Sequence, residues 1–266
     1  MSLDRRDFLR LAGLSTIVGV AGQGTADALA QQRLPAKAPG LPDVTPRENP
    51  LTAKRWAMVI DMRKWTDQDS ERCIRACNEA HNVPQFDNPK DEVKWLWVEN
   101  FEHSFPSHEN HYLAETMHHK MVPLLCNHCD NPPCTRVCPT QATWKREQDG
   151  IVMMDWHRCI GCRYCIAACP YGSRSFNWRD PRPHIKHELN YDFPTRERGV
   201  VEKCTFCEER LAEGELPACV QACTSGAMAF GDLEDPDSEV RHLLHENFSI
   251  RRKPGLGTQP EVYYLV

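Results

Sequence analysis

Cysteine gives the strongest chemical signal in this chain, which has 266 residues and 14 cysteines. Twelve of them form three compact groups that each end in Cys-x3-Cys, and one group reads CIGCRYCIAACP from Cys159 to Pro170. Thiols this crowded repel one another as thiolates unless a metal neutralises them, and geometry disfavours a disulfide inside Cys-x2-Cys. The pattern therefore favours metal centres over a disulfide scaffold.

Two of these groups have the spacing of a paired iron–sulfur site. In each, the first three cysteines wrap three corners of a [4Fe–4S] cluster, and the fourth, followed by Pro139 or Pro170, points to the neighbouring cluster. Zinc is disfavoured because zinc sites rarely use two such overlapping runs. We predict crossed ligation: Cys126, Cys129, Cys134 and Cys169 bind cluster 1, and Cys159, Cys162, Cys165 and Cys138 bind cluster 2.

The last group needs a partner group that the chain only half supplies. Near the start of the chain only Cys73 and Cys77 stand at the right spacing, while the two earlier slots hold Asp67 and Ser70. We predict a cluster 3 whose ligands are Cys204, Cys207, Cys219 and Cys77.

Cys73 and Cys223 are then left over, and we expect them to lie close together. Three states stay open for this leftover pair: buried thiols, a disulfide in an oxidising compartment, or half the ligands of an unusual fourth cluster completed by Asp67 or Ser70. The ligand arithmetic favours three [4Fe–4S] clusters over four.

Short elements are expected to position these groups. Apolar runs predict strands at 55–61, 94–100, 173–178, 227–230 and 261–266, and a hairpin over 142–155 with its turn at 148–150. Helices are expected at 71–79 and 237–247, a loop with a helical turn at 101–120, and a surface excursion at 179–203. Because the cysteine units recur, we predict an α+β fold of two pseudo-symmetric bacterial-ferredoxin-like halves, with loop insertions and a C-terminal extension.

The N-terminus has the features of a secretion signal. Arg5 and Arg6 precede a moderately apolar stretch and a small-x-small site that ends at Ala30. We interpret residues 1–30 as a twin-arginine signal peptide rather than an ordinary amphipathic helix, with cleavage after Ala30 or retention as an anchor both open. Export in the folded state suits cofactors built in the cytoplasm. Residues 31–54 are interpreted as an extended linker, 55–235 as the multi-cluster domain, and 236–266 as a C-terminal helix and tail.

The overall composition argues against nucleic-acid binding and against a membrane-spanning segment. The net charge of −5 and a pI near 6.2 argue against nucleic-acid binding. The mean hydropathy is −0.58, and no apolar run reaches the roughly 18 to 20 residues of a membrane span. Any association with a membrane is expected to run through partner proteins.

Other residues near the cysteines are given conservative interpretations. A docking loop is favoured over a metal site for five histidines: His103, His108, His111, His118 and His119. His128, inside a Cys-x2-Cys, is expected to tune a cluster rather than ligate it. For Trp144, Trp156 and Trp178, core packing is favoured over shielding of the clusters from water. For Arg158, Arg163 and Arg174, a solvated basic face is favoured over pairing with partner carboxylates or raising the local potential. We find no nucleophile, acid–base pair or nucleotide loop, so no catalytic site is expected.

With these motifs in hand, residues 55–235 resemble the multi-cluster ferredoxin-like electron-transfer subunits of the dimethyl-sulfoxide-reductase and polysulfide-reductase type. Such subunits usually have four clusters, and this chain departs from them at its first group. Within that family, stretches such as LCNHCDNPPCTRVCPTQATWKRE and the tail RRKPGLGTQPEVYYLV are similar to the periplasmic O subunit of the sulfite-reductase-associated DsrMKJOP complex.

The resemblance implies a periplasmic electron-transfer subunit, peripheral to the cytoplasmic membrane. It implies a multihaem cytochrome c and a quinone-interacting integral membrane protein as partners. Two alternatives stay open: an electron-transfer subunit of a molybdopterin oxidoreductase, such as a polysulfide, tetrathionate or nitrite-linked reductase, and a protein whose clusters are only structural.

Overall fold

The structure is a computed structural model that describes residues 49–108, 112 and 115–266. The expected signal peptide and most of the expected linker lie outside the described residues. The body of the chain, Pro46–Val266, forms one compact unit. Its mixed helix and strand content agrees with the predicted α+β class, whereas a two-fold relation between its halves stays a prediction.

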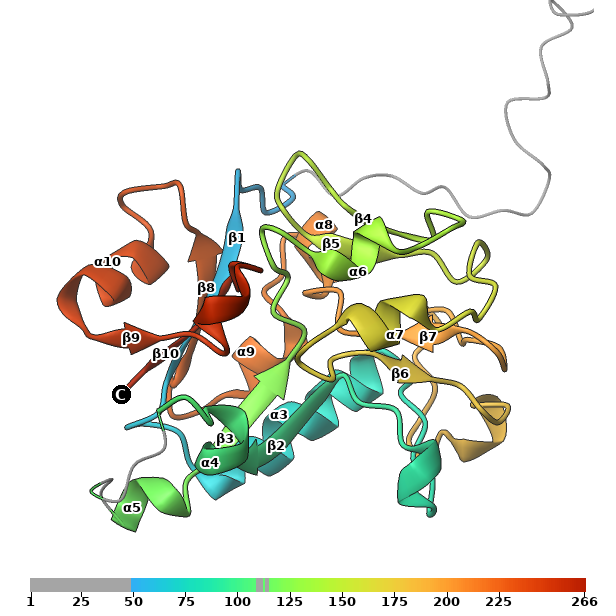
Figure 1. The fold of residues 1–266 in the computed structure, drawn as a ribbon, viewed down its shortest axis with the longest axis horizontal. Coiled ribbons are helices and arrows are strands. Elements are labelled where there is room, and N and C mark those ends of the chain that lie inside the picture. The colour runs from blue at the N-terminus through green and yellow to red at the C-terminus, as the bar shows by residue number, and fades with distance from the viewer. Residues whose placement is uncertain (1–48, 109–111, 113–114) are drawn as a thin grey trace, which may run out of the picture. The chain divides into compact units, whose positions relative to one another are not determined.

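A four-stranded sheet forms one side of this unit (Figure 1). Its order is β8 (Met228–Asp232), β1 (Trp56–Asp61), β10 (Val262–Leu265) and β9 (Ser249–Ile250). Strand β1 runs antiparallel to β8 and parallel to β10, with Met58 opposite both Phe230 and Val262. All six residues of β1 are buried, which explains why its first five residues form a continuous apolar run rather than an alternating one.

Helix α3 (Asp67–Ala80) is the longest element of the described residues and carries Cys73 and Cys77. Thr66 caps it, and Thr66 and Asp69 form a reciprocal capping box. Two cysteines four residues apart share one helix face, so both are buried against the short helix α9 (Ala218–Ala222). Helix α10 (Glu239–Glu246) covers β8 and β1 on another side.

A second group of short elements holds the middle cysteines. Helix α6 (Pro133–Arg136) packs on α7 (Tyr164–Ala168), beside the hairpin of β4 (Thr143–Lys145) and β5 (Val152–Met154). Strands β6 (Ser175–Phe176) and β7 (Val201–Glu202) pair behind them. In Figure 1 this group lies apart from the four-stranded sheet, with α3 running below both.

The remaining elements connect these two parts. Strands β2 (Leu96–Asn100) and β3 (Met121–Leu125) form an antiparallel pair that leads directly into the first cysteine loop. The others are α4 (Phe101–Ser104), α5 (Glu115–His118), α8 (Glu208–Ala212), and the 3-10 turns η1 (Pro89–Asp91), η2 (Arg182–His184) and η3 (Pro254–Leu256). No helix among the described residues is long and apolar enough to cross a membrane.

Most of the expected helices and strands are confirmed, although their first and last residues differ from the predicted ones. The predicted helix at 71–79 begins four residues earlier, at Asp67, because the Thr66–Asp69 capping box starts it there. The C-terminal residues form a strand inside the central sheet, between β1 and β9, and belong to the same compact unit as the cysteine groups.

Candidate iron–sulfur sites

The four cysteines predicted for cluster 1 line one small cavity. Cys126 and Cys129 lie in the loop after β3, Cys134 lies in α6, and Cys169 ends α7. Cys169 thus leaves its own sequence group and faces the cysteines of the other group. The structure brings together the donor set that crossed ligation requires, and the ligand assignment itself stays a prediction.

The cluster 2 cysteines line a second small cavity. Cys159 and Cys162 come from the loop before α7, Cys165 from α7, and Cys138 from the turn after α6. Backbone N–H of Ala142 donates to the Cys138 sulfur at 3.2 Å. Cys138, Cys159 and Cys162 are partly exposed, so this site reaches the protein surface.

Left-handed backbone conformations curl the cysteine loops around these cavities. Gly161 and Arg163 in one loop, and His128 in another, have positive φ angles. A Cβ on Gly161 would clash with the carbonyl oxygen of Gly199, so only glycine fits there. The glycine in CIGC therefore has a steric role that the sequence motif alone does not reveal.

The cluster 3 cysteines meet where α3 and α9 face each other. Cys77 interacts electrostatically with Cys204 and Cys219, and Cys207 with all three. All four are buried. Cys204 also interacts with Cys126 of cluster 1, and Cys165 of cluster 2 with Cys134 of cluster 1. The three sites therefore follow one another in the order cluster 2, cluster 1, cluster 3.

The leftover pair also comes together, as expected, beyond cluster 3. The Cys73 and Cys223 thiols are in hydrogen-bonding contact, and this contact, outweighing burial, lowers the pKa of Cys223 to about 6. The two slots that would complete a fourth cluster lie at the start of the same helix, α3. Asp67 is exposed, and Ser70 donates to the Thr66 carbonyl at 3.4 Å within the same helix. The two thiols by themselves supply half the ligands of a [4Fe–4S] cluster, so three clusters stay the prediction.

The protonation of buried thiols indicates what the cluster 1 and cluster 3 donor sets require. Burial, with the nearby Cys126, raises the pKa of Cys129 to about 12, and burial raises the pKa of Cys219 to about 12. Buried thiols of this kind ionise only when a bound cation supplies positive charge. Soft sulfur donors, four to a site around compact cavities, fit [4Fe–4S] clusters.

Two buried cationic side chains, Arg174 and Lys203, donate hydrogen bonds among these sites. The sequence predicts a solvated face for Arg174 and does not single out Lys203. Arg174, expected on a solvated face, is buried and donates to the Cys134 sulfur at 3.0 Å. Lys203, fully buried, donates to the Cys204 carbonyl at 2.6 Å and to that of Val152. Arg174 lies 40 residues along the chain from Cys134, whereas Lys203 directly precedes Cys204, and neither position belongs to a motif that predicts burial.

His128 is held by its neighbours rather than aimed at a cluster. Its Nε2 donates to the Cys204 carbonyl at 3.1 Å, and the Val152 N–H donates to its Nδ1 at 3.1 Å. Burial, with the positive charge of Lys203, keeps its pKa well below the ordinary value, so the ring is neutral. His128 stacks on Phe206 and links the cluster 1 loop to the cluster 3 loop.

A second histidine that the sequence did not single out lies beside cluster 3. His81 is buried, and its Nδ1 donates to the Cys77 carbonyl at 2.7 Å. Its Nε2 lies 2.9 Å from a carboxylate oxygen of Glu209. Ligand atoms of His81, Glu209 and Cys207 lie within 4.8 Å of one another, so a histidine and a carboxylate flank this site.

The exposed aromatic and histidine residues have mixed outcomes. Trp156 packs against the core as expected, whereas Trp144 and Trp178 are 37% and 45% exposed, so core packing was the wrong prediction for them. Trp178 instead stacks with the guanidinium of Arg163 near cluster 2. His103 pairs with Glu99, and His111 and the side chain of His118 lie outside the described residues.

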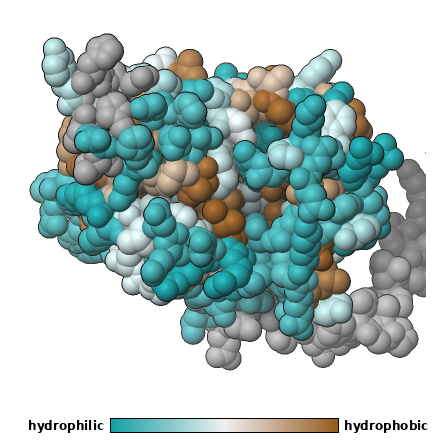
Figure 2. Space-filling model, turned by 90° about the horizontal axis from the view of Figure 1, so that it is seen from below, coloured by the Kyte–Doolittle hydropathy of each residue, from teal (hydrophilic) through white to brown (hydrophobic). Residues whose placement is uncertain are grey.

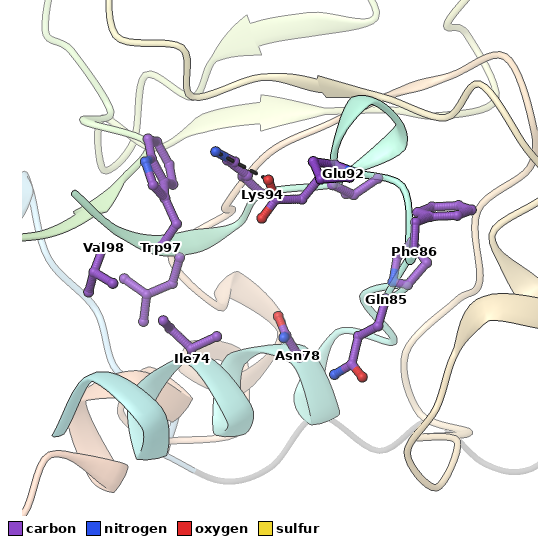
Figure 3. Close-up of a pocket in the computed structure, with 12 residues that line it drawn as sticks. Ile74, Asn78, Gln85, Phe86, Glu92, Lys94, Trp97 and Val98 are labelled. Atoms are coloured by element: carbon purple, nitrogen blue, oxygen red, sulfur yellow. Dashed lines mark ion pairs between the residues drawn. The ribbon is translucent and has the colours of Figure 1, made fainter. Parts of the chain in front are cut away.

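An open pocket lies on a different side of α3 from these sites. Ile74 and Asn78 of α3 face Trp97 and the segment around Gln85 across this pocket (Figure 3). The surface of the molecule seen from below, in Figure 2, is mainly hydrophilic, with a few apolar residues gathered in its middle. No cysteine lines this pocket, so it is separate from the redox sites.

Comparisons with known proteins agree with these sites. A family model described as a 4Fe-4S dicluster domain matches residues 117–184 and 180–233. The chain is 38% identical to the Hdr-like menaquinol oxidoreductase iron-sulfur subunit 1 of Archaeoglobus fulgidus, over 98% of this chain and 97% of that protein.

Two further relatives are subunits of reductases. A tetrathionate reductase subunit of Salmonella typhimurium is 36% identical over 100% of this chain and 89% of its own length. The putative dimethyl sulfoxide reductase iron-sulfur subunit of Halobacterium salinarum is 40% identical over 79% of this chain and 78% of its own. This chain therefore belongs to the family of iron–sulfur subunits of molybdopterin-type oxidoreductases, and it is an electron-transfer subunit of an oxidoreductase complex rather than a catalytic one.

Proposed function

We propose that this chain carries single electrons through three [4Fe–4S] clusters between two redox partners of a quinone-linked complex. The observation that carries the proposal is the row of three four-cysteine sites in the order cluster 2, cluster 1, cluster 3. Each bound cluster supplies one reversible one-electron step. The chain itself holds the clusters near one another and shields them from water.

The two ends of the row differ in access. At cluster 2, three cysteines are partly exposed, and the apolar side chains of Ile160 and Tyr164 beside them are 66% and 62% exposed. At cluster 3, all four cysteines are buried. Because electron transfer weakens steeply with distance, the surface over Cys159 and Cys162 is where a partner's redox centre can come close. We assign one partner to this surface.

For the complex as a whole, the molybdopterin hypothesis is favoured over the sulfite-reductase-associated one. The tetrathionate and dimethyl sulfoxide reductase subunits support a catalytic molybdopterin partner for this chain. A second candidate keeps a specific observation in its favour, because the menaquinol oxidoreductase subunit matches nearly the whole chain. In that candidate, a DsrMKJOP-type complex, the partners are a quinone-interacting membrane protein and a multihaem cytochrome c.

The N-terminal residues are the basis for the cellular location that we propose. Arg5, Arg6 and the small-x-small site ending at Ala30 support export by the twin-arginine route, followed by a periplasmic location peripheral to the cytoplasmic membrane. Replacing both arginines with lysine is expected to keep the folded chain in the cytoplasm. Fractionation of cells that express both forms tests this location.

One purification distinguishes the two complexes. The tagged chain is isolated from detergent-solubilised membranes of its own cells, and molybdenum and haem c are measured per chain. Molybdenum at one per complex without haem c supports the molybdopterin hypothesis. Haem c without molybdenum supports the DsrMKJOP-type candidate, and clusters that do not reduce and reoxidise reversibly would refute electron transfer altogether.

A further inference from the structure

The side chain of Arg174 lies between two of the candidate sites. One guanidinium nitrogen, Nη2, donates to the Cys134 sulfur of cluster 1 at 3.0 Å and to the Thr143 hydroxyl at 2.9 Å. The same guanidinium also lies close enough to Cys165 of cluster 2 to interact with its sulfur by charge. Arg174 therefore contacts ligands predicted for two adjacent clusters at once.

The charge of Arg174 has no carboxylate to neutralise it within the part of the chain that the structure describes. Its remaining hydrogen-bonding contact is the Met154 sulfur. Arginine stays protonated at any physiological pH, and Arg174 is only 4% exposed, so its charge is permanent and poorly screened by salt.

Beside cluster 3, by contrast, a carboxylate cancels the charge of a buried arginine. Arg196, near Cys77 of cluster 3, is fully buried and forms a 2.7 Å ion pair with the equally buried Glu202. Glu209 adds a further carboxylate beside Cys77 and Cys207. Lys203 faces both Cys126 and Cys204, so it acts on clusters 1 and 3 together and does not separate them.

We propose that Arg174 raises the reduction potentials of clusters 1 and 2 above that of cluster 3. Reduction adds one negative charge to a cluster, and a fixed positive charge in a low-dielectric interior stabilises that form. Arg174 is thus a positioning residue, which acts on the clusters through its charge. It favours the reduced form of clusters 1 and 2, so an electron resides there more often than on cluster 3. The inference rests on the proposed function, since it needs the three clusters to be present.

The test is a redox titration of the purified, cluster-loaded full chain, followed by electron paramagnetic resonance. A Cys77→Ser variant assigns the cluster 3 signal. Arg174→Gln removes the charge and keeps a hydrogen-bond donor, whereas Arg174→Lys keeps the charge. Arg158→Gln is the matched control, because Arg158 also lies beside a cluster 2 ligand but is 63% exposed and paired with Asp155.

In Arg174→Gln, the reduction potentials of clusters 1 and 2 are expected to fall. The expected fall is at least tenfold in the reduction equilibrium constant, which equals about 59 mV for one electron. The reduction potential of cluster 3 is expected to stay unchanged in Arg174→Gln. In the control Arg158→Gln, all three potentials are expected to stay unchanged. In Arg174→Lys, the three potentials are expected to stay close to those of the native protein. Equal shifts of all three signals, or no shift in Arg174→Gln, would overturn the proposal.

The native protein gives a second test that needs no variant. Clusters 1 and 2 are expected to reduce at higher potentials than cluster 3, and a highest potential at cluster 3 contradicts the inference. Failure of the proposed function would look different. In that case the native chain would hold fewer than three clusters, or its clusters would not titrate reversibly.

Discussion

Single cysteines in this protein serve a site other than the one their sequence group suggests. Cys169 belongs to the run that begins at Cys159, yet it lines the cluster 1 cavity with Cys126, Cys129 and Cys134. Cys138 makes the reciprocal exchange into the cluster 2 cavity. Each exchange ties two loops to one inorganic centre, so the loss of one cysteine should reveal which centre it holds.

Replacing Cys169 with serine is expected to remove cluster 1 and to spare cluster 2. The loss should be about four iron atoms per chain, the content of one [4Fe–4S] cluster. Iron analysis and electron paramagnetic resonance of the anaerobically purified variant measure it. Cys138→Ser is the matched variant and should remove cluster 2 instead. Loss of cluster 2 in Cys169→Ser would show that ligation is not crossed.

The leftover pair allows a count of the clusters. Native protein is expected to contain about 12 iron atoms and about 12 acid-labile sulfides per chain, the content of three [4Fe–4S] clusters. The double variant Cys73→Ser, Cys223→Ser should keep that content, because neither thiol is a predicted ligand. Cys77→Ser should lower it by about a third. A native content of about 16 would show that a fourth cluster exists despite the positions of Asp67 and Ser70.

At the scale of elements, the loop before α7 depends on one glycine. Gly161 and Gly172 both have φ near +70°, but a Cβ would meet the Gly199 carbonyl at Gly161 and open space at Gly172. Gly172→Ala should cost only the strain of a left-handed residue, about 1–2 kcal/mol. Gly161→Ala should cost more and should weaken cluster 2, seen as faster loss of its signal on mild heating. Equal behaviour of the two variants would argue against the steric role.

Helix α3 should lose stability in acid through its cap. Burial opposes ionisation of Asp69, but hydrogen bonds from Thr66 and Ser225 lower its pKa below 3.8 overall. A carboxyl whose folded pKa is depressed stabilises the fold above its unfolded pKa, and that stability is lost as pH falls through the folded pKa.

Asp69→Asn and Thr66→Ala are therefore each expected to lower stability by about 1 kcal/mol near neutral pH. For Asp69→Asn, the difference from native protein should shrink below pH 4, where the native carboxyl also becomes protonated. Denaturant unfolding at several pH values, followed by circular dichroism, measures it. A difference that stays constant down to pH 2 would assign the effect to packing rather than charge.

Across the whole molecule, the C-terminal segment supports the cysteine sites directly. The N–H groups of Asp130 and Asn131 donate to the carbonyls of Gln259 and Thr258, at 2.8 and 3.0 Å. The Thr258 side chain hydrogen-bonds to Cys129. Strand β10 then passes between β1 and β9. The end of the chain therefore closes both the central sheet and the cluster 1 loop.

Removal of residues 262–266 is expected to prevent folding. Val262, Tyr264 and Leu265 are fully buried, and each contributes about 1.5–3 kcal/mol of burial. Together with the lost strand pairing, this approaches the total stability of a domain, about 5–15 kcal/mol. The truncated chain should accumulate as insoluble protein without iron. Removal of Val266 alone is the control and should be tolerated; a soluble, cluster-loaded form of the longer truncation would contradict the role of β10.

The sequence by itself determined the features that depend on local spacing. The Cys-x2-Cys and Cys-x3-Cys spacings show which cysteines stand together, so the three predicted donor sets and the leftover pair could be read from them, and apolar runs predicted most of the short strands. The early start of α3 was also readable in principle, because Thr66 and Asp69 have the spacing of a capping box.

Only the tertiary structure decided which distant residues surround these donor sets. Arg174 reaches Cys134 across 40 residues, and Tyr264 donates to the Pro123 carbonyl across 141. Neither contact leaves a periodic trace in the sequence, because a side chain's burial and its partners depend on how separate segments pack. The sequence therefore identifies the thiols that can hold the clusters, whereas the packing of remote segments places the charges and strands around them.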